Sequence, residues 1–274
     1  MFIKISRSII TLLILLTTLC TTTALAEKPV YQYHKGTMGS GYKQYINSGA
    51  GGRGGMPTKP RANVSSSSKR ILDISEWQGA LTDAQVKALK KNYDFIIIRG
   101  QYGSEYVDKC LANNSALLDK YNMKFGVYSY SMYENADDAR YEARTLHQRA
   151  PKADFYINDY EQQTVKSGDE NTATQAWAAE MKKLAGNKKV LFYSYENFML
   201  NHVANAINAY DGCWLAAYQQ TEPQSEHVLW QYTDHYYASE LKQNVDANYV
   251  SQNLNQNFLS TRLNSTLQNR TYVL

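Results

Sequence analysis

Short apolar runs alternate with segments of helical periodicity from Ile71 onward, and this alternation constrains the fold more than any other feature. The apolar runs that predict β-strands are 71–75, 95–101, 125–131, 155–161, 190–195, 213–218, 228–233 and 244–249. The segments that predict helices are 82–92, 108–121, 136–150, 172–184 and 197–209. Thr82 followed by Gln85 predicts a capping box at the start of the first of them. Short polar loops separate the last three strands and leave little room for helices there.

Strands joined by helices predict an α/β fold, and eight of them predict a modified (β/α) barrel of the TIM type with about 200 residues. Its last third is degenerate, because the connections between the final strands are too short for full helices. An open doubly wound sheet is the alternative. Such a sheet carries a Gly-rich phosphate loop after a strand, and none follows any strand predicted here. The sequence therefore favours the barrel and predicts no nucleotide cofactor.

The first 26 residues have the pattern of a secretory signal peptide. A positively charged start precedes an apolar stretch from Ile9 to Leu19 and the small-residue cleavage sequence Ala24-Leu25-Ala26. The stretch is short for a membrane span, which needs about 20 apolar residues, although an uncleaved anchor is the alternative. Leu19 is too large for lipoprotein processing at Cys20, so no lipid anchor is predicted. We expect cleavage near Ala26 and a secreted or cell-wall-associated protein.

The formal net charge of +4 conceals a basic leader and an acidic body. Residues 27–70 hold eight Lys or Arg and one Glu among many Gly, Ser and Pro, which predicts a flexible linker. Residues 71–274 hold 19 basic and 24 acidic side chains, which disfavours a compact nucleic-acid-binding body. The linker is either a spacer or a segment that contacts anionic cell-wall polymers. The polar tail 251–274 either packs on the barrel at 71–250 or extends from it.

Beyond the signal sequence the chain has two cysteines, Cys110 and Cys213. In an oxidising compartment they could pair, and buried free thiols are the equal alternative. Their spacing fits no zinc or iron–sulfur motif, so no metal is predicted.

A barrel of this type builds its active site at the C-terminal ends of its strands, and acidic residues recur there on the predicted strands. Asp73 lies on the first strand, Asp159 and Glu161 end the fourth, and Asp246 lies on the eighth. Residues two apart on a strand face the same side, about 6.6–6.8 Å apart along the chain. Repulsion between two such carboxylates keeps one protonated near neutral pH, the combination that glycosidic bond cleavage uses. A lone Asp-x-Glu would more often lie on a surface loop, but three strands here deliver four carboxylates.

Aromatic side chains accompany these acids on the predicted strands. Their flat faces can stack on sugar rings while their polar tips bond hydroxyls. About half of them could instead belong to the core, because alternate strand residues face the helices. The preferred substrate contacts are Tyr128, Tyr130, Trp214, Tyr218 and Trp230.

Several short motifs occur in an order that resembles a known family. They are Asp73-Ile74-Ser75, Trp77-Gln78-Gly79, Phe95-Ile96-Ile97-Ile98-Arg99, Gly126-Val127-Tyr128-Ser129-Tyr130, Asp159-Tyr160-Glu161, Trp214-Leu215-Ala216-Ala217-Tyr218, Trp230-Gln231-Tyr232-Thr233 and Val245-Asp246-Ala247-Asn248. The ordered set resembles the Chalaropsis-type lysozymes, glycoside hydrolase family 25, over about residues 70–250. Within this family, the sequence is similar to those of secreted or phage-associated muramidases of lactic acid bacteria.

This resemblance implies a bacteriolytic enzyme that acts without a cofactor as a monomer. It would cleave the β-1,4 bond between N-acetylmuramic acid and N-acetylglucosamine in peptidoglycan. By the resemblance, Glu161 matches the general acid, Asp159 its partner carboxylate, and Asp73 and Asp246 the flanking acids. Asp159 would orient the substrate's 2-acetamido group, which can attack the anomeric centre. The sequence leaves open whether configuration is retained.

Two alternatives come from other classes of protein. A chitinase-like barrel hydrolase carries the signature Asp-x-x-Asp-x-Asp-x-Glu, which is met at Asp154, Asp159 and Glu161 but has Ile157 at its second aspartate. A non-catalytic glycan-binding barrel would keep the aromatics and could lose the acids, whereas all four acids are present.

Overall fold

The computed structural model describes residues 38–39 and 70–251. The predicted signal peptide, most of the linker and the tail from 252 lie outside the described residues. The strands are β1 (Ile71–Ile74), β2 (Phe95–Tyr102), β3 (Tyr106–Val107), β4 (Lys124–Tyr130), β5 (Phe155–Asp159), β6 (Lys189–Tyr195), β7 (Gly212–Ala216), β8 (Leu229–Ala238) and β9 (Gln243–Val250). All eight predicted strands are present, and β3 is an addition.

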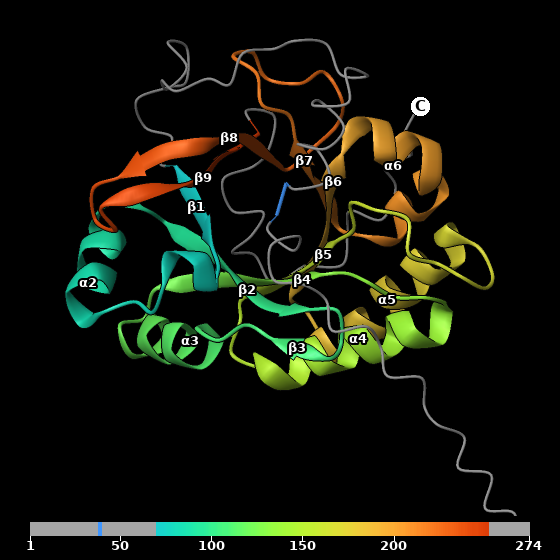
Figure 1. Cartoon of the computed structure of the whole chain (residues 1–274), viewed down its shortest axis with the longest axis horizontal. Helices are drawn as coiled ribbons and strands as arrows, with labels where there is room; N and C mark the ends of the chain where they lie inside the picture. The colour runs from blue at the N-terminus through green and yellow to red at the C-terminus, as the bar shows by residue number, and fades with distance from the viewer. Residues whose placement is uncertain (1–37, 40–69, 252–274) are drawn as a thin grey trace, which may run out of the picture. The chain divides into compact units, whose positions relative to one another are not determined.

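Eight of these strands close into a ring, which confirms the predicted barrel (Figure 1). The order is β1-β9-β8-β7-β6-β5-β4-β2, and pairing of β1 with β2 completes it, while β3 pairs with β2 outside the ring. Within the ring, each of the strands β1, β2, β4, β5, β6 and β7 runs parallel to the next, ending with β8. β9 runs antiparallel to both β8 and β1. The loop between β8 and β9 is too short for the crossover that parallel strands need, so these two form a hairpin.

Helices cover the outside of the parallel part of the ring. They are α2 (Asp83–Asn92), α3 (Leu111–Lys120), α4 (Ala136–Arg149), α5 (Glu170–Ala185) and α6 (Glu196–His202), with 3₁₀ turns η2 (Glu76–Gln78) and η3 (Ala204–Ala209). Figure 1 shows α3, α4 and α5 along the side of the ring formed by β2, β4 and β5, with the β8–β9 hairpin opposite. The segment predicted as one helix over 197–209 is α6 followed by η3. No helix within the described residues is long and apolar enough to span a bilayer.

The predicted capping box begins α2. The Thr82 hydroxyl accepts a hydrogen bond from the Gln85 backbone at 3.3 Å, and the Gln85 side chain accepts one from the Thr82 backbone at 2.9 Å. Such a cap satisfies amide groups that the first helical turn leaves unpaired and stabilises a helix by about 1 kcal/mol. A local sequence signal therefore fixes where this helix starts.

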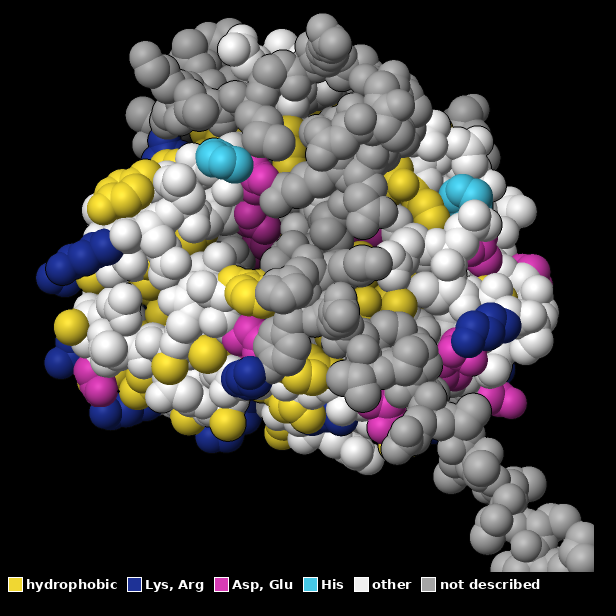
Figure 2. Space-filling model, viewed as in Figure 1, with side chains coloured by type: hydrophobic (Ala, Val, Ile, Leu, Met, Phe, Trp, Pro, Cys, Tyr) yellow, Lys and Arg dark blue, Asp and Glu magenta, His cyan; other side chains and the backbone are white. Residues whose placement is uncertain are grey.

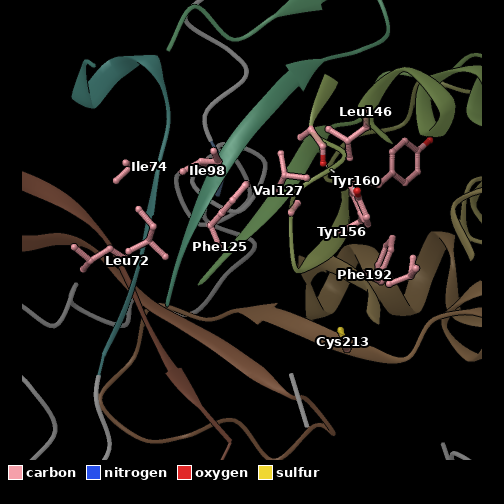
Figure 3. Packing of buried hydrophobic residues seen from close by; sticks show 14 of the residues in the cluster. Leu72, Ile74, Ile98, Phe125, Val127, Leu146, Tyr156, Tyr160, Phe192 and Cys213 are labelled. Carbon is pink, nitrogen blue, oxygen red and sulfur yellow. Dashed lines mark hydrogen bonds between the residues drawn. The ribbon is translucent and has the colours of Figure 1, made fainter. Parts of the chain in front are cut away.

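The main hydrophobic core lies between the ring and the helices (Figure 3). Every second residue along a strand points into this core. Examples are Leu72 and Ile74 of β1, Ile98 of β2 and Val127 of β4. Leu146 of α4 packs against this layer from the helical side. Because strand side chains alternate between faces, the intervening residues point into the barrel. The position of the core therefore decides which strand residues can build a site at the mouth.

Cys110 and Cys213 are both free thiols, so the pairing alternative is wrong. Cys213 is buried in the hydrophobic core, and burial raises the pKa of its thiol to about 12. A thiol that stays protonated at neutral pH is a weak nucleophile. Cys213 is thus a small apolar packing residue.

Candidate active site

Two of the four predicted carboxylates come from the end of β5. Asp159 is the last residue of β5 and Glu161 lies two residues beyond it, and they are 0% and 1% exposed. Tyr160 between them belongs to the outer core and stacks on Tyr133, with ring centroids 4.6 Å apart. The outward direction of Tyr160 leaves both acids on the inner side of the barrel.

Asp159 and Glu161 interact as a coupled pair. Burial, followed by the charge of Glu161, raises the pKa of the Asp159 carboxyl well above its usual range. Neither oxygen of Asp159 has a hydrogen bond of good geometry to any residue the structure describes. Two carboxyl groups that interact in this way titrate as one system, and their repulsion favours keeping one of them protonated. This arrangement combines a proton donor with a negative charge at one point of the mouth.

Asp73 of β1 is held by two side-chain amides, one from the adjacent strand β9 and one from β8 beyond it. Gln231 of β8 donates to both of its oxygens, at 3.3 and 3.2 Å, and Asn248 of β9 donates to Oδ2 at 2.7 Å. The Asp73 carboxyl is 2% exposed. These charge-assisted hydrogen bonds fix the orientation of Asp73 inside the barrel.

Asp246 is brought next to Asp73 by the reversed direction of β9. The register of β1 and β9 places Asp73 opposite Asp246, so both side chains lie on the same face. Asp246 is half-buried, and its charge acts on the Tyr218 hydroxyl. The expectation of a C-terminal strand end is wrong for this residue. In an antiparallel strand the N-terminal half reaches the mouth, and Asp246 lies in that half.

Tyrosines and a tryptophan surround the acids on the inner face. Tyr193 and Tyr218 both donate their hydroxyls to Gln231 Oε1, at 2.7 and 2.9 Å. Burial raises the pKa of both hydroxyls well above 10, so they remain donors. Trp214 meets the Tyr193 ring edge-on at 4.7 Å and donates to Asn248 at 2.8 Å.

Two more predicted aromatic contacts line the inner side of β4. Tyr128 is 2% exposed and lies within electrostatic range of Asp73 and Asp159. Tyr130 stacks on Tyr102 of β2, with centroids 5.0 Å apart and ring planes 10° apart. Together with Trp214 and Tyr218, the structure brings four of the five predicted aromatics to the inner side of the barrel.

The fifth predicted aromatic, Trp230, does not join the site. It belongs to the outer hydrophobic core, packs near Tyr232 and Tyr249, and donates its indole N–H to the Ala217 carbonyl at 2.7 Å. Its neighbour Gln231 contacts Asp73, and adjacent strand residues face opposite sides. Trp230 is therefore a core residue.

Arg99 of β2 is a further inward residue that sequence reasoning did not assign to the site. It pairs with Asp108 at 2.9 Å and with Glu76 at 2.8 Å, and all three side chains are largely buried. Glu76 also accepts from the Tyr106 hydroxyl at 2.8 Å. The network holds η2, which carries the 39% exposed Trp77, against β2.

One sequence signal could have revealed the inward polar residues that the sequence analysis did not assign to the site, which are Arg99, Tyr193, Gln231 and Asn248. Each is a polar or amphipathic side chain at an inward, buried position of a strand. Burying such a group is costly unless a partner awaits it, so its presence indicates an organised polar interior. Among the described residues no cluster of three or more His, Cys, Asp or Glu could hold a metal ion.

A barrel whose mouth presents a coupled carboxyl pair, flanking acids and buried aromatics has the components of a glycoside hydrolase site. The profile described as Glycosyl hydrolases family 25 matches residues 72–241. The chain belongs to this family, the lysozyme or muramidase family that its motifs resemble, and is a glycoside hydrolase.

Solved structures agree with this assignment. The catalytic domain of endolysin ply40, from bacteriophage P40 of Listeria monocytogenes, is 29% identical with a TM-score of 0.63, over 69% of this chain and 96% of that one. The autolysin LytC from Streptococcus pneumoniae is 25% identical with a TM-score of 0.57, over 69% of this chain and 48% of that one. The GHIP virulence factor of Streptococcus pneumoniae, a glycosyl hydrolase 25, shares the fold at 22% identity and a TM-score of 0.62, over 68% of this chain and 88% of that one. No curated protein sequence matches the chain.

Proposed function

We propose that the protein is a secreted peptidoglycan hydrolase that cleaves the β-1,4 bond between N-acetylmuramic acid and N-acetylglucosamine. The observation that carries the proposal is the coupled pair of Asp159 and Glu161, because a glycosidase needs a retained proton beside a negative charge. The relatives support the substrate class: one is a phage endolysin, and LytC was solved in complex with a synthetic peptidoglycan ligand.

Glu161 is the proposed general acid. It donates the proton of the pair to the glycosidic oxygen as the bond from that oxygen to the anomeric carbon breaks. The 2-acetamido oxygen of the substrate then bonds to the anomeric carbon, and water displaces it while returning a proton to Glu161. Atoms and protons balance over this cycle, and the enzyme ends in its starting state.

Asp159 is the proposed partner that orients the acetamido group. Apart from the interaction with Glu161, its buried oxygens have no hydrogen bond of good geometry among the described residues, and a buried carboxyl so short of donors is costly. A substrate amide N–H would supply the missing donor. Its own negative charge, when present, would also stabilise the positive charge that develops at the anomeric carbon.

The flanking residues complete the proposed sugar site. Asp73 and Asp246 would accept hydrogen bonds from sugar hydroxyls, since both lie on the inner face at the mouth. The inward aromatics proposed as substrate contacts are Tyr128, Tyr130, Trp214 and Tyr218.

Secretion and wall attachment are further parts of the proposal. The signal-like residues 1–26 would direct export of the protein, which would act as a monomer. The eight Lys and Arg of residues 27–70 would bind anionic polymers of the cell wall. Replacing those Lys and Arg with Gln should weaken binding to walls, most visibly at low salt. Unchanged binding would make residues 27–70 a spacer.

The test compares the full chain with Glu161→Gln on a suspension of Gram-positive walls. We expect wild type to clear the suspension and the variant to lose at least a hundredfold in rate, the range for a general acid. Glu105→Gln, an exposed carboxylate, is the matched control and should behave as wild type. Equal clearing by Glu161→Gln would refute the assignment of the acid. Fragments with N-acetylglucosamine at the reducing end would refute the bond specificity.

A further inference from the structure

Two residues that precede the barrel in sequence lie inside its mouth. Met38 and Gly39 are described together with residues 70–251, and Figure 1 draws them as the short blue segment within the ring of strands. Met38 is 1% exposed although it does not belong to the main hydrophobic core. The Gly39 amide donates a hydrogen bond to Glu161 Oε1 at 2.7 Å. The acid at the centre of the site is thus engaged by its own chain.

The fit at this position requires glycine. Gly39 has a φ of +79°, which L side chains rarely adopt. A Cβ atom built there would lie 2.1 Å from the Tyr218 hydroxyl, 3.0 Å from Gln231 Oε1 and 3.3 Å from the Tyr193 hydroxyl. Those three atoms are tied to one another by hydrogen bonds and cannot all withdraw. Backbone conformation and available space therefore independently select glycine at residue 39.

The contact blocks the atom that catalysis needs. A general acid must reach the glycosidic oxygen within about 2.6–3.2 Å, and the Gly39 amide nitrogen already holds one Glu161 oxygen at that distance. The space beside the inner tyrosines is also filled, because a single added carbon would collide there. A sugar and the Met38–Gly39 segment cannot occupy this position at the same time.

We propose that Met38 and Gly39 act as an intramolecular inhibitor, so that the full chain is partly latent until this segment leaves the barrel mouth. The inference rests on the proposed role of Glu161. Complementary charge favours the docked state, because residues 27–70 are strongly basic and residues 71–274 carry five more acidic than basic side chains. A column of acidic side chains (magenta) lies in the upper centre of the face in Figure 2.

A weak contact is sufficient, because the segment is tethered to the barrel. A short tether gives an effective concentration of about 1 mM. If the dipeptide bound with a dissociation constant of about 0.1 mM, roughly one barrel in ten would be open at any moment. The wild-type chain would then retain measurable activity, and releasing the segment would raise its rate about tenfold.

The test uses four full-length chains on soluble, uncrosslinked peptidoglycan strands: wild type, Gly39→Val, Gly54→Val and Glu161→Gln. The rate of release of reducing ends should rise about tenfold in Gly39→Val. Gly54 is a leader glycine outside the described residues, and its Val variant, the matched control, should have the wild-type rate. A Gly39→Val rate equal to or below wild type, with Glu161→Gln inactive, would overturn the proposed inhibition.

Hydrogen exchange separates failure of this inference from failure of the proposed function. Relative to its intrinsic exchange rate, the Gly39 amide in wild type should be protected at least tenfold more than the amide at the same position in Gly39→Val, whether or not any glycan is cleaved. If no chain releases reducing ends, the function fails, while slow exchange at Gly39 still supports docking of the segment. Fast exchange of Gly39 in wild type would overturn the docking itself.

Discussion

Gln231 of β8 donates its side-chain amide to both carboxylate oxygens of Asp73 on β1, reaching across β9 to a residue 158 positions earlier in the chain. The same side chain accepts hydrogen bonds from Tyr193 and Tyr218. One amide therefore connects a flanking acid with two inner tyrosines. Because all of these groups are buried, the loss of one partner leaves the others without compensation.

Replacing this amide should damage both activity and stability. Gln231→Met keeps the length of the side chain but leaves the Asp73 carboxylate and two hydroxyls underbonded. We expect kcat to fall about tenfold or more through misplacement of Asp73, and the free energy of unfolding to fall by about 1–3 kcal/mol. Enzyme kinetics and urea unfolding measure the two effects. Gln175→Met at an exposed position is the control, and its free energy of unfolding should lie within about 0.5 kcal/mol of wild type. An unchanged kcat in Gln231→Met would show that Asp73 needs no positioning by Gln231.

Asp159→Asn should change how activity depends on pH. In wild type, burial and then the charge of Glu161 raise the pKa of Asp159, so the two carboxyls titrate as a pair. Removing one carboxyl removes the repulsion that keeps the proton on the pair at higher pH. The alkaline limb of the pH–rate profile should therefore move to lower pH, by about one unit or more, in whatever activity remains. A profile with an unmoved alkaline limb would mean that the two groups titrate independently.

Two tryptophans on opposite faces of the barrel wall should respond differently to the same substitution. Trp230→Phe loses the hydrogen bond to Ala217 and core packing, so the free energy of unfolding should fall by about 1–3 kcal/mol with KM and kcat nearly unchanged. Trp214→Phe loses the hydrogen bond to Asn248, which holds Asp73, and should lower kcat. Thermal unfolding and kinetics on soluble strands measure the pair. A rise in KM for Trp230→Phe would return Trp230 to the substrate site.

Glu142 should make the free energy of unfolding depend on pH. It is buried on α4, where its carboxyl accepts from the Ser129 hydroxyl at 2.7 Å and the Met132 amide at 3.1 Å. Burial raises the pKa of Glu142 from 4.5 to about 7, so the folded state binds a proton that the unfolded state releases. Its contribution is complete below pH 4.5 and is lost as the pH rises toward 7, by about 3 kcal/mol at most.

Glu142→Gln imitates the protonated carboxyl and removes this titration. The difference in unfolding free energy between wild type and Glu142→Gln should therefore shift against wild type between pH 5 and pH 8, as urea unfolding can measure. The exposed Glu105→Gln should show no such shift. A constant difference between Glu142→Gln and wild type would mean that Glu142 is ionised at both pH values.

The local pattern of the sequence determined the elements of this fold and one part of its site. Short apolar runs predicted all eight strands of the ring, and the capping box predicted the start of α2. The period-two alternation of strand side chains placed Asp159 and Glu161 on one side of a strand end, with Tyr160 on the other. These features depend on residues a few positions apart, so they can be read without knowledge of the rest of the chain.

Only the tertiary structure decided which face of each strand points inward and which strands meet. The alternation of side chains along a strand places Trp230 and Gln231 on opposite faces but does not determine which face is inside. In the folded barrel Gln231 points inward. Antiparallel pairing of β9 with β1 placed Asp246 opposite Asp73. Contact between Gly39 and Glu161 joins residues 122 positions apart, with no signal in the local sequence of either. Such relationships join residues far apart in the sequence, so closure and register of the whole ring and the packing of its interior decide them.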